Sequence, residues 1–405
     1  MSASSTPTDG NLRGLHWSYA LLGVADGTLL PFIPLLLVGR GLSPAGVGVV
    51  LAATAAAWFS VGLATAYLAD RRLSPERMVV LASIGAAGVA LLLILPGGLT
   101  GALIVVALTL VRSPLMLLDP ITLRRLRQAP RTDYARIRLR TSAGWAVSSI
   151  ASGAVFQGFG LRILPFVYAP LALMFGGWAW RSLKPMAAEP AVPAATPAKV
   201  KRIPAAFGWF LVCCFLLGAS LAATQNFLTL QINGLGGGAL LIGAAAGFQA
   251  LTEIPTMAYI HVLTRYLSHR WLFVIGCAIY LVIYVAWALV TDATVAALLK
   301  LVGGVAFALT FVAAVVIANE LVPSRLRATG QALMKSVLFG VAPILGALGG
   351  GFVYDLFGAR VMFLGSTFFV IGAGFLALLV VPTPAKAPAV QAAAPPAPEP
   401  AAAAP

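Results

Sequence analysis

The sequence predicts an all-α integral membrane protein with about twelve transmembrane helices, arranged as two six-helix bundles. Of its 405 residues, 60% are hydrophobic and only 10% are charged, whereas a soluble domain carries roughly 25% charged residues. Apolar runs long enough to cross a hydrocarbon core of about 30 Å recur along the chain. An internal repeat divides these runs into two equal sets.

The apolar runs give the order and extent of the helices. We expect them at 14–38, 45–69, 77–96, 101–122, 141–160, 163–182, 207–231, 239–262, 271–290, 294–318, 330–352 and 360–382. Three cysteines fall inside these runs, where they are more typical of small buried hydrophobic residues than of disulfides or metal ligands.

The basic residues indicate the orientation. With the N-terminus in the cytoplasm, three of the 27 Lys and Arg lie outside and two within helices, which leaves 22 (27 − 3 − 2) in cytoplasmic segments. This is the positive-inside pattern, and it places both termini in the cytoplasm. The same distribution explains the net charge of +15 without a nucleic-acid partner. We expect a multi-pass protein of the cell's inner (plasma) membrane.

The domain boundaries follow from the Pro- and Ala-rich central linker and from the Ala- and Pro-rich C-terminal tail. The predicted units are a cytoplasmic tail (1–13), an N-terminal bundle (14–183), a cytoplasmic linker (184–206), a C-terminal bundle (207–382) and an Ala/Pro-rich tail (383–405) that we expect to be disordered.

Three loop motifs of the first half recur, in similar form, in the second half. RRLSPER at 71–77 resembles RYLSHR at 265–270, RLRTS at 138–142 resembles RLRAT at 325–329, and FQGFGLR at 156–162 resembles YDLFGAR at 354–360. A repeat of six helices with equal orientation implies two bundles related by an axis along the membrane normal, with a substrate path between them.

The same loops carry a family resemblance. YLADRRLSPER at 67–77 resembles the acidic–basic loop motif of the major facilitator superfamily. Within it, the chain is similar to the branch of lactose-permease-like, nucleoside–proton and phenylpropionate-type symporters. The stretches that carry this similarity are PFIPLLLVGRGLSPAGVG (31–48), DYARIRLRTSAGW (133–145), LTEIP (251–255) and RATGQAL (327–333). The resemblance implies the major facilitator fold and transport by alternating access.

Two charged residues lie at a similar depth within helices of the first bundle. Asp26 lies about 12 residues, or roughly 18 Å, into its helix, and Arg112 lies at a similar depth in the fourth helix. A charge in lipid is costly and therefore a functional candidate. By resemblance these helices line the cavity, so the pair is a candidate for substrate binding, with Asp26 also for proton coupling. The alternative is a structural ion pair.

Glu253 is the main candidate for proton coupling. It lies near the middle of the eighth helix, beside Pro255, and in the family that the chain resembles an acid at this point takes part in coupling. A carboxyl in a low-dielectric site can alternate between neutral and charged forms near neutral pH. The alternative is an acid paired with a neighbouring helix.

Further candidates for substrate binding are polar or aromatic. The amides of Gln225, Asn226 and Gln249 can bind a ligand or join helices. Trp145 can stack on a ring or lie at the headgroup level. Lys300 can attract an anion or extend to the outer surface.

Charged residues near the cytoplasmic helix ends form a predicted gate. In it, arginines close the inner mouth by contacting acids and helix C-termini. The predicted gating residues are Asp70, Arg71, Asp119, Arg136, Arg138, Arg140, Glu320, Arg325 and Arg327. Ordinary positive-inside bias is the alternative for the arginines.

These residues favour a proton-coupled symporter of a small organic solute. A proton-driven exporter of drugs or metabolites is the alternative, and a receptor or scaffold is disfavoured because it has no reason to bury charges. Neither a P-loop, zinc spacing nor a GxSxG motif is found, which argues against an enzyme and against ATP as the energy source. We expect no cofactor or metal, a small-molecule substrate, protons and lipid as partners, and a monomer.

Overall fold

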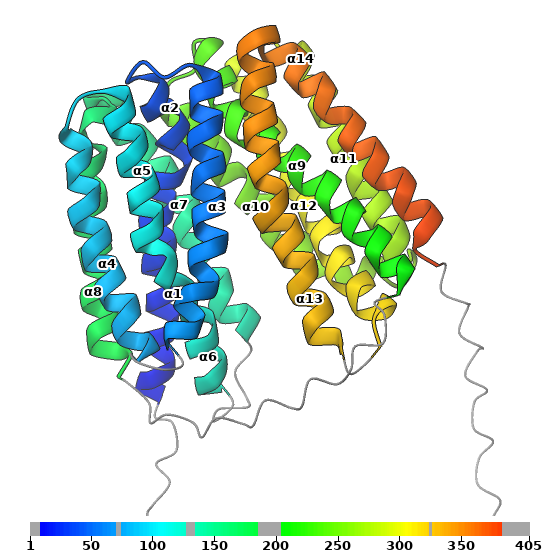
Figure 1. Ribbon diagram of the computed structural model, residues 1–405, viewed down its shortest axis with the longest axis horizontal. Coiled ribbons are helices and arrows are strands. Elements are labelled where there is room, and N and C mark those ends of the chain that lie inside the picture. Colours follow the sequence, from blue (N-terminus) through cyan, green and yellow to red (C-terminus); the bar gives the residue numbers. More distant parts are fainter. Residues whose placement is uncertain (1–8, 70–73, 127–133, 185–203, 324–325, 383–405) are drawn as a thin grey trace, which may run out of the picture.

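The computed structural model describes residues 9–69, 74–126, 134–184, 204–323 and 326–382, and its elements are helical throughout these ranges (Figure 1). The first half contains α1 (Asp9–Leu29), α2 (Ile33–Val38), α3 (Pro44–Ala69), α4 (Pro75–Leu91), α5 (Gly98–Arg112), α6 (Leu118–Leu126), α7 (Tyr134–Phe159) and α8 (Leu164–Ser182). The second half contains α9 (Ala205–Gly234), α10 (Ala239–Leu263), α11 (His269–Leu289), α12 (Ala293–Leu321), α13 (Arg327–Ser336) and α14 (Ala342–Val380).

The all-helical membrane class that the sequence predicts is confirmed. Nine stretches of the described chain are long and apolar enough to cross a membrane, and the longest, Thr329–Val380, contains a break at Gly358. Each predicted apolar run overlaps a helical segment. The number of crossings and the side on which the termini lie stay predictions.

Prolines account for three interruptions within the predicted spans. A 3₁₀ turn at Leu30–Phe32 separates α1 from α2 and contains Pro31, and a 3₁₀ segment at Ser113–Leu117 separates α5 from α6 and contains Pro114. A π-helical segment, Val337–Val341, joins α13 to α14 just before Pro343. Proline has no amide hydrogen and its ring crowds the preceding turn, so a helix breaks or changes pitch there.

Four glycines with positive φ support the internal repeat. Gly160 (φ 79°) and Gly358 (φ 82°) are 198 residues apart (358 − 160), and Gly41 and Gly236 (both φ 87°) are 195 apart (236 − 41). Both separations agree with those of the loop motifs, and glycine is the residue that adopts this conformation without steric cost. The matching turns place equivalent breaks in the two halves.

The helices pack as two groups. Helices α1 to α8 contact one another mainly through α1 with α7 and α8 and through α4 with α5 and α8, whereas α9 packs on α14 and α12 on α10 and α11. The two groups meet along α7 with α10 and α3 with α14. Figure 1 shows them leaning together at the top and diverging toward the end where α1 and α9 begin.

Glycines bring the two groups into contact at the end opposite the start of α1. A Cβ on Gly243 would lie 2.0 Å from the carbonyl oxygen of Ser149, and one on Gly48 would lie 2.9 Å from the Cα of Gly351. Such distances are below van der Waals contact, so only glycine allows these helices to approach so closely.

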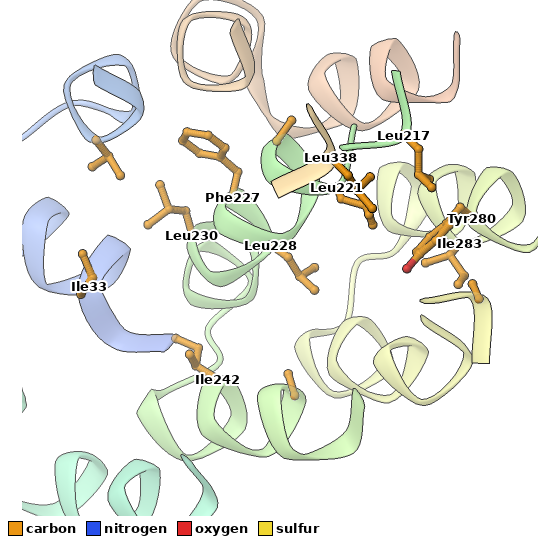
Figure 2. Packing of buried hydrophobic residues seen from close by; sticks show 14 of the residues in the cluster. Ile33, Leu217, Leu221, Phe227, Leu228, Leu230, Ile242, Tyr280, Ile283 and Leu338 are labelled. Carbon is orange, nitrogen blue, oxygen red and sulfur yellow. The ribbon is translucent and has the colours of Figure 1, made fainter. Parts of the chain in front are cut away.

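Apolar side chains complete this contact. Figure 2 shows Leu228 and Leu230 of α9 in the main hydrophobic cluster, which also contains Ile33 of the first group and Ile242 of α10. The two groups are therefore closed on the side that the sequence predicts to be outside.

Candidate functional site

A cavity of about 420 Å³ lies between the two groups of helices. Both groups contribute to it. The lining residues are Leu30, Pro31, Thr141, Ser142 and Trp145 from the first half, and Gln225, Asn226, Leu228, Thr229, Ile232, Ile242, Ala245, Ala246, Gln249, Ala250, Glu253 and Lys300 from the second.

The position of Lys300 depends on the close packing of α10 and α12. A Cβ on Gly304 would lie 2.2 Å from the carbonyl oxygen of Gln249, and the hydroxyl of Thr252 donates to the carbonyl oxygen of Leu301 at 2.6 Å. Within this contact the Lys300 ammonium donates to the Gln249 side-chain oxygen at 2.8 Å. Lys300 is only 8% exposed, so its ammonium lies inside the protein and does not extend to the outer surface.

Glu253 lies on the same face of α10 as Gln249, because residues four apart stack on one side of a helix. Its side chain is half-buried and lines the cavity. The charge of Lys300, from α12, interacts with it, as does that of Arg138, from α7. Pro255 follows two residues later inside α10. The site thus places a carboxyl group and a buried amine on the wall of one cavity.

The amide and aromatic candidates line the cavity, whereas a neighbouring amide lies in the packed interior. Gln225, Asn226 and Trp145 line the cavity. The Asn226 amide nitrogen donates to the carbonyl oxygen of Ala222 at 2.8 Å, so its amide oxygen is the group offered to a ligand. Gln231, a neighbouring amide, instead donates to the backbone of α11 at 2.5 Å and serves as an interhelical contact.

Two hydroxyls of α7 join the site, although the sequence pattern does not single them out. Thr141 and Ser142 line the cavity, and the Thr141 hydroxyl is buried without a hydrogen-bond partner. The backbone of Thr141 lies against Gly23 of α1, which fixes its position. Their sequence signals are their place in the RLRTS motif, 138–142, and their position one turn before Trp145 on the same helix.

Asp26 and Arg112 form an ion pair away from the residues that line the cavity. The Arg112 side chain is 7% exposed and that of Asp26 is 21% exposed. The guanidinium also lies over the ring of Tyr168, 6.0 Å from its centroid. The sequence places both charges at similar depth, and the structure shows that each neutralises the other within the first group of helices.

The predicted gating residues Asp119, Arg138 and Glu320 lie at the end where the two groups diverge (Figure 1). Asp119 accepts from the hydroxyl of Tyr19 at 2.6 Å and pairs with Arg138 at 3.0 Å. Glu320 pairs with His269 at 3.1 Å, a partner that the sequence does not suggest. Each of these two ion pairs joins residues of one group.

Three further gating candidates have exposed side chains, and three lie in parts of the chain that the structure does not describe. The side chains of Arg136, Arg140 and Arg327 are exposed. Asp70, Arg71 and Arg325 lie outside the described residues.

Comparison with known proteins identifies the fold. A family model described as the MFS_1 like family matches residues 15–365. The solved structure of a point mutant of the nucleoside transporter NupG is 18% identical, with a TM-score of 0.79, over 92% of this chain and 100% of that chain.

Two other transporters are similar in fold. A bacterial homolog of the human lysosomal transporter Spinster, inward-facing and unoccupied, is 14% identical, with a TM-score of 0.68, over 94% of this chain and 98% of that chain. A POT family transporter in complex with 5-aminolevulinic acid is 15% identical, with a TM-score of 0.71, over 91% of this chain and 96% of that chain. No curated protein sequence matches this chain.

These findings confirm the resemblance drawn from the loop motifs. The protein is a multi-pass membrane transporter of the secondary type for a small molecule and not an enzyme. Because the family model spans most of its length, the chain belongs to the MFS_1-like family of major facilitator transporters.

Proposed function

We propose that the protein is a proton-coupled symporter of a small organic solute, with Glu253 as the coupling residue. The observation that carries the proposal is the location of Glu253 on the wall of the cavity between the two groups of helices, which the buried Lys300 also lines. A carboxyl at this place meets a different environment when the cavity opens to one side or the other. Its proton affinity then depends on which side it faces, and this links proton flow to solute flow.

The polar lining favours uptake of a specific solute over export of apolar compounds. Three amides, those of Gln225, Asn226 and Gln249, surround the cavity together with the hydroxyls of α7. Such groups bind a solute by directed hydrogen bonds, whereas an exporter of diverse drugs favours a large apolar cavity. The indole ring of Trp145 supplies an apolar face for the solute's carbon skeleton.

Alternating access follows from the packing between the groups. Glycine contacts such as Gly243 with Ser149 and Gly48 with Gly351 close the predicted outer side. The two groups rock about the cavity, so that these contacts separate while the cytoplasmic ends approach. Asp119 with Arg138 and Glu320 with His269 are then placed to contact the opposite group. In this cycle residues 14–183 and 207–382 move as the two bundles, joined by the linker 184–206.

Asp26 is the second candidate for coupling. Its carboxylate is held by Arg112, so it would exchange a proton only if this pair separated during the cycle. Glu253, which has no such dedicated partner among the hydrogen bonds of the described residues, needs no separation of that kind.

The test uses purified protein in proteoliposomes that contain a pH-sensitive dye. Nucleosides, sugars, short peptides, amino acids and carboxylates are added in turn. Solute-driven proton movement in the direction of the solute identifies a symporter, and movement in the opposite direction identifies an exporter.

The coupling residue is then tested with the solute that is found. Glu253→Gln should abolish uphill accumulation driven by a pH gradient, yet keep solute binding and one-for-one counterflow, because these need no net proton movement. Asp355→Asn, which changes an exposed acid of α14, is the matched control and should behave as the wild type. Unchanged proton-driven accumulation by Glu253→Gln would exclude Glu253 and leave Asp26 as the next candidate.

A further inference from the structure

The charged residues around the cavity are of two kinds. Some are held in ion pairs, whereas the charge of the others can change when a proton or a ligand binds. Arg112 is neutralised by Asp26, and Arg138 is paired with Asp119 at 3.0 Å. Among the described residues that line the cavity, Glu253 is the acid and Lys300 the base. The charge of the binding site therefore depends on the protonation of Glu253 and on what binds beside Lys300.

We propose that the substrate is a small organic monoanion bearing a carboxylate, bound by Lys300, and that one proton on Glu253 accompanies each anion. This inference rests on the proposed function, since it requires Glu253 to be the group that takes the proton. It adds the class of the substrate and the stoichiometry.

The reasoning is a balance of charge in a site of low dielectric, where an uncompensated charge is strongly disfavoured. With Glu253 ionised and Lys300 protonated, the empty site carries no net charge. An anion alone leaves an excess negative charge, and a proton alone leaves an excess positive charge. When both bind, the neutral carboxyl of Glu253 and the pair of Lys300 with the anion again give a balanced site. Proton and anion therefore assist each other's binding, which by linkage gives one-to-one symport without net charge movement.

The geometry around Lys300 suits a carboxylate. An ammonium has three hydrogen-bond donors, and the Gln249 oxygen accepts one of them at 2.8 Å. The others remain for the two oxygens of a carboxylate, and the amide nitrogen of Gln249 can add a further donor. Thr141, whose hydroxyl is buried without a hydrogen-bond partner, lines the same cavity from α7, and Trp145 follows one turn later on that helix. A volume of about 420 Å³ accommodates a carboxylate with a modest carbon skeleton.

The groups that interact with Glu253 come from three neighbouring helices. They are Lys300 of α12, Arg138 of α7 and Tyr280 of α11. Arg138 is compensated by Asp119, and the hydroxyl of Tyr280 is directed to the carbonyl oxygen of Gly303 at 3.5 Å. Among the described residues that line the cavity, Lys300 is therefore the base held by a neutral amide, and Glu253 is the acid that shares its cavity.

One test needs no substrate. Infrared spectra of the protein in lipid, with Glu253→Gln used to assign the carboxyl band of Glu253, give the pH at which this group loses its proton. Replacing the cation by Lys300→Met should change this midpoint. Lys335→Met, which removes an exposed cation of α13, is the control and should leave it in place. An unchanged midpoint in Lys300→Met would overturn the balance between the two groups.

The second test uses carboxylates and their neutral amides of nearly equal shape: acetate, butyrate and benzoate with acetamide, butyramide and benzamide. In dye-loaded proteoliposomes at least one carboxylate should drive proton influx, its amide should not, and electrodes on supported membranes should record no steady transport current. Lys300→Met should lower the apparent affinity for that carboxylate by at least about tenfold, whereas Lys335→Met should not.

The outcomes separate this inference from the proposed function. If nucleosides, sugars or peptides drive proton influx while no carboxylate does, the substrate class is wrong and proton symport stands. A carboxylate-driven steady current would overturn the one-to-one stoichiometry. If a solute exchanges across the membrane but none moves protons, the proposed function itself fails.

Discussion

Neutralising Asp26 should destabilise the protein more than neutralising Arg112, and neutralising both should cost less than the sum. The reason is the unequal burial of the two side chains, which are 21% and 7% exposed. Asp26→Asn strands a guanidinium that is almost fully enclosed and whose Nε already lacks a partner. Arg112→Gln strands a carboxylate that is less enclosed by the protein.

The magnitude follows from the cost of an unpaired buried charge. Breaking a buried ion pair by removing one partner costs about 3–5 kcal/mol. The ring of Tyr168, 6.0 Å from the guanidinium, offsets about 1 kcal/mol of that cost in Asp26→Asn. We therefore expect a loss of about 3 kcal/mol for Asp26→Asn. The loss for Arg112→Gln should be smaller, about 2 kcal/mol, because the stranded carboxylate is less enclosed by the protein, and the coupling energy in the double variant should be about 2–3 kcal/mol.

The assay is equilibrium unfolding in mixed micelles with increasing SDS, followed by circular dichroism. A thiol-reactive dye gives a second probe in the other half of the chain, because Cys213, Cys214 and Cys277 are all buried. Asp26→Glu, which keeps the pair, is the control and should lose less than Asp26→Asn. Losses that add to within about 0.5 kcal/mol would show that the two side chains do not interact, and the charge inventory of the site would then need revision.

Three further substitutions test the packing. Gly243→Ala places a methyl group against the backbone of α7 and should shift the protein toward the outward-open state. The shift is measured by spin-label distances across the outer ends. Gly158→Ala is the control and should cause no shift, because a Cβ there would have no atom within 4 Å. Gln231→Leu removes the hydrogen bond to the Trp287 carbonyl oxygen and should lower the free energy of unfolding by about 1 kcal/mol with no change in solute affinity. Asp119→Asn breaks an exposed ion pair, so its effect on stability should stay below about 1 kcal/mol, while a changed rate of transport at equal affinity would support its role in the gate.

The sequence identified several residues of the candidate site because a charge within an apolar run is conspicuous. Glu253 and Lys300 are such charges, and both line the cavity. Asp26 and Arg112 are equally conspicuous, yet they do not line it. Depth along a helix can be counted from the sequence, whereas the direction in which a side chain points depends on the rotation of the helix against its neighbours. Thr141 and Ser142 were missed because hydroxyls near the end of a predicted span do not stand out.

The sequence by itself determined the membrane class, the helical spans and the internal repeat, because these depend on local composition and on the conformations that glycine and proline allow. Gly160 and Gly358, for example, mark equivalent turns in the two halves. Only the tertiary structure decided which polar groups meet: Arg112 with Asp26, 86 residues away, and Lys300 with Gln249, 51 residues away. The Lys300–Gln249 contact is set by the close approach of α10 and α12 at Gly304. A buried charge is stabilised by whichever group the packing places beside it.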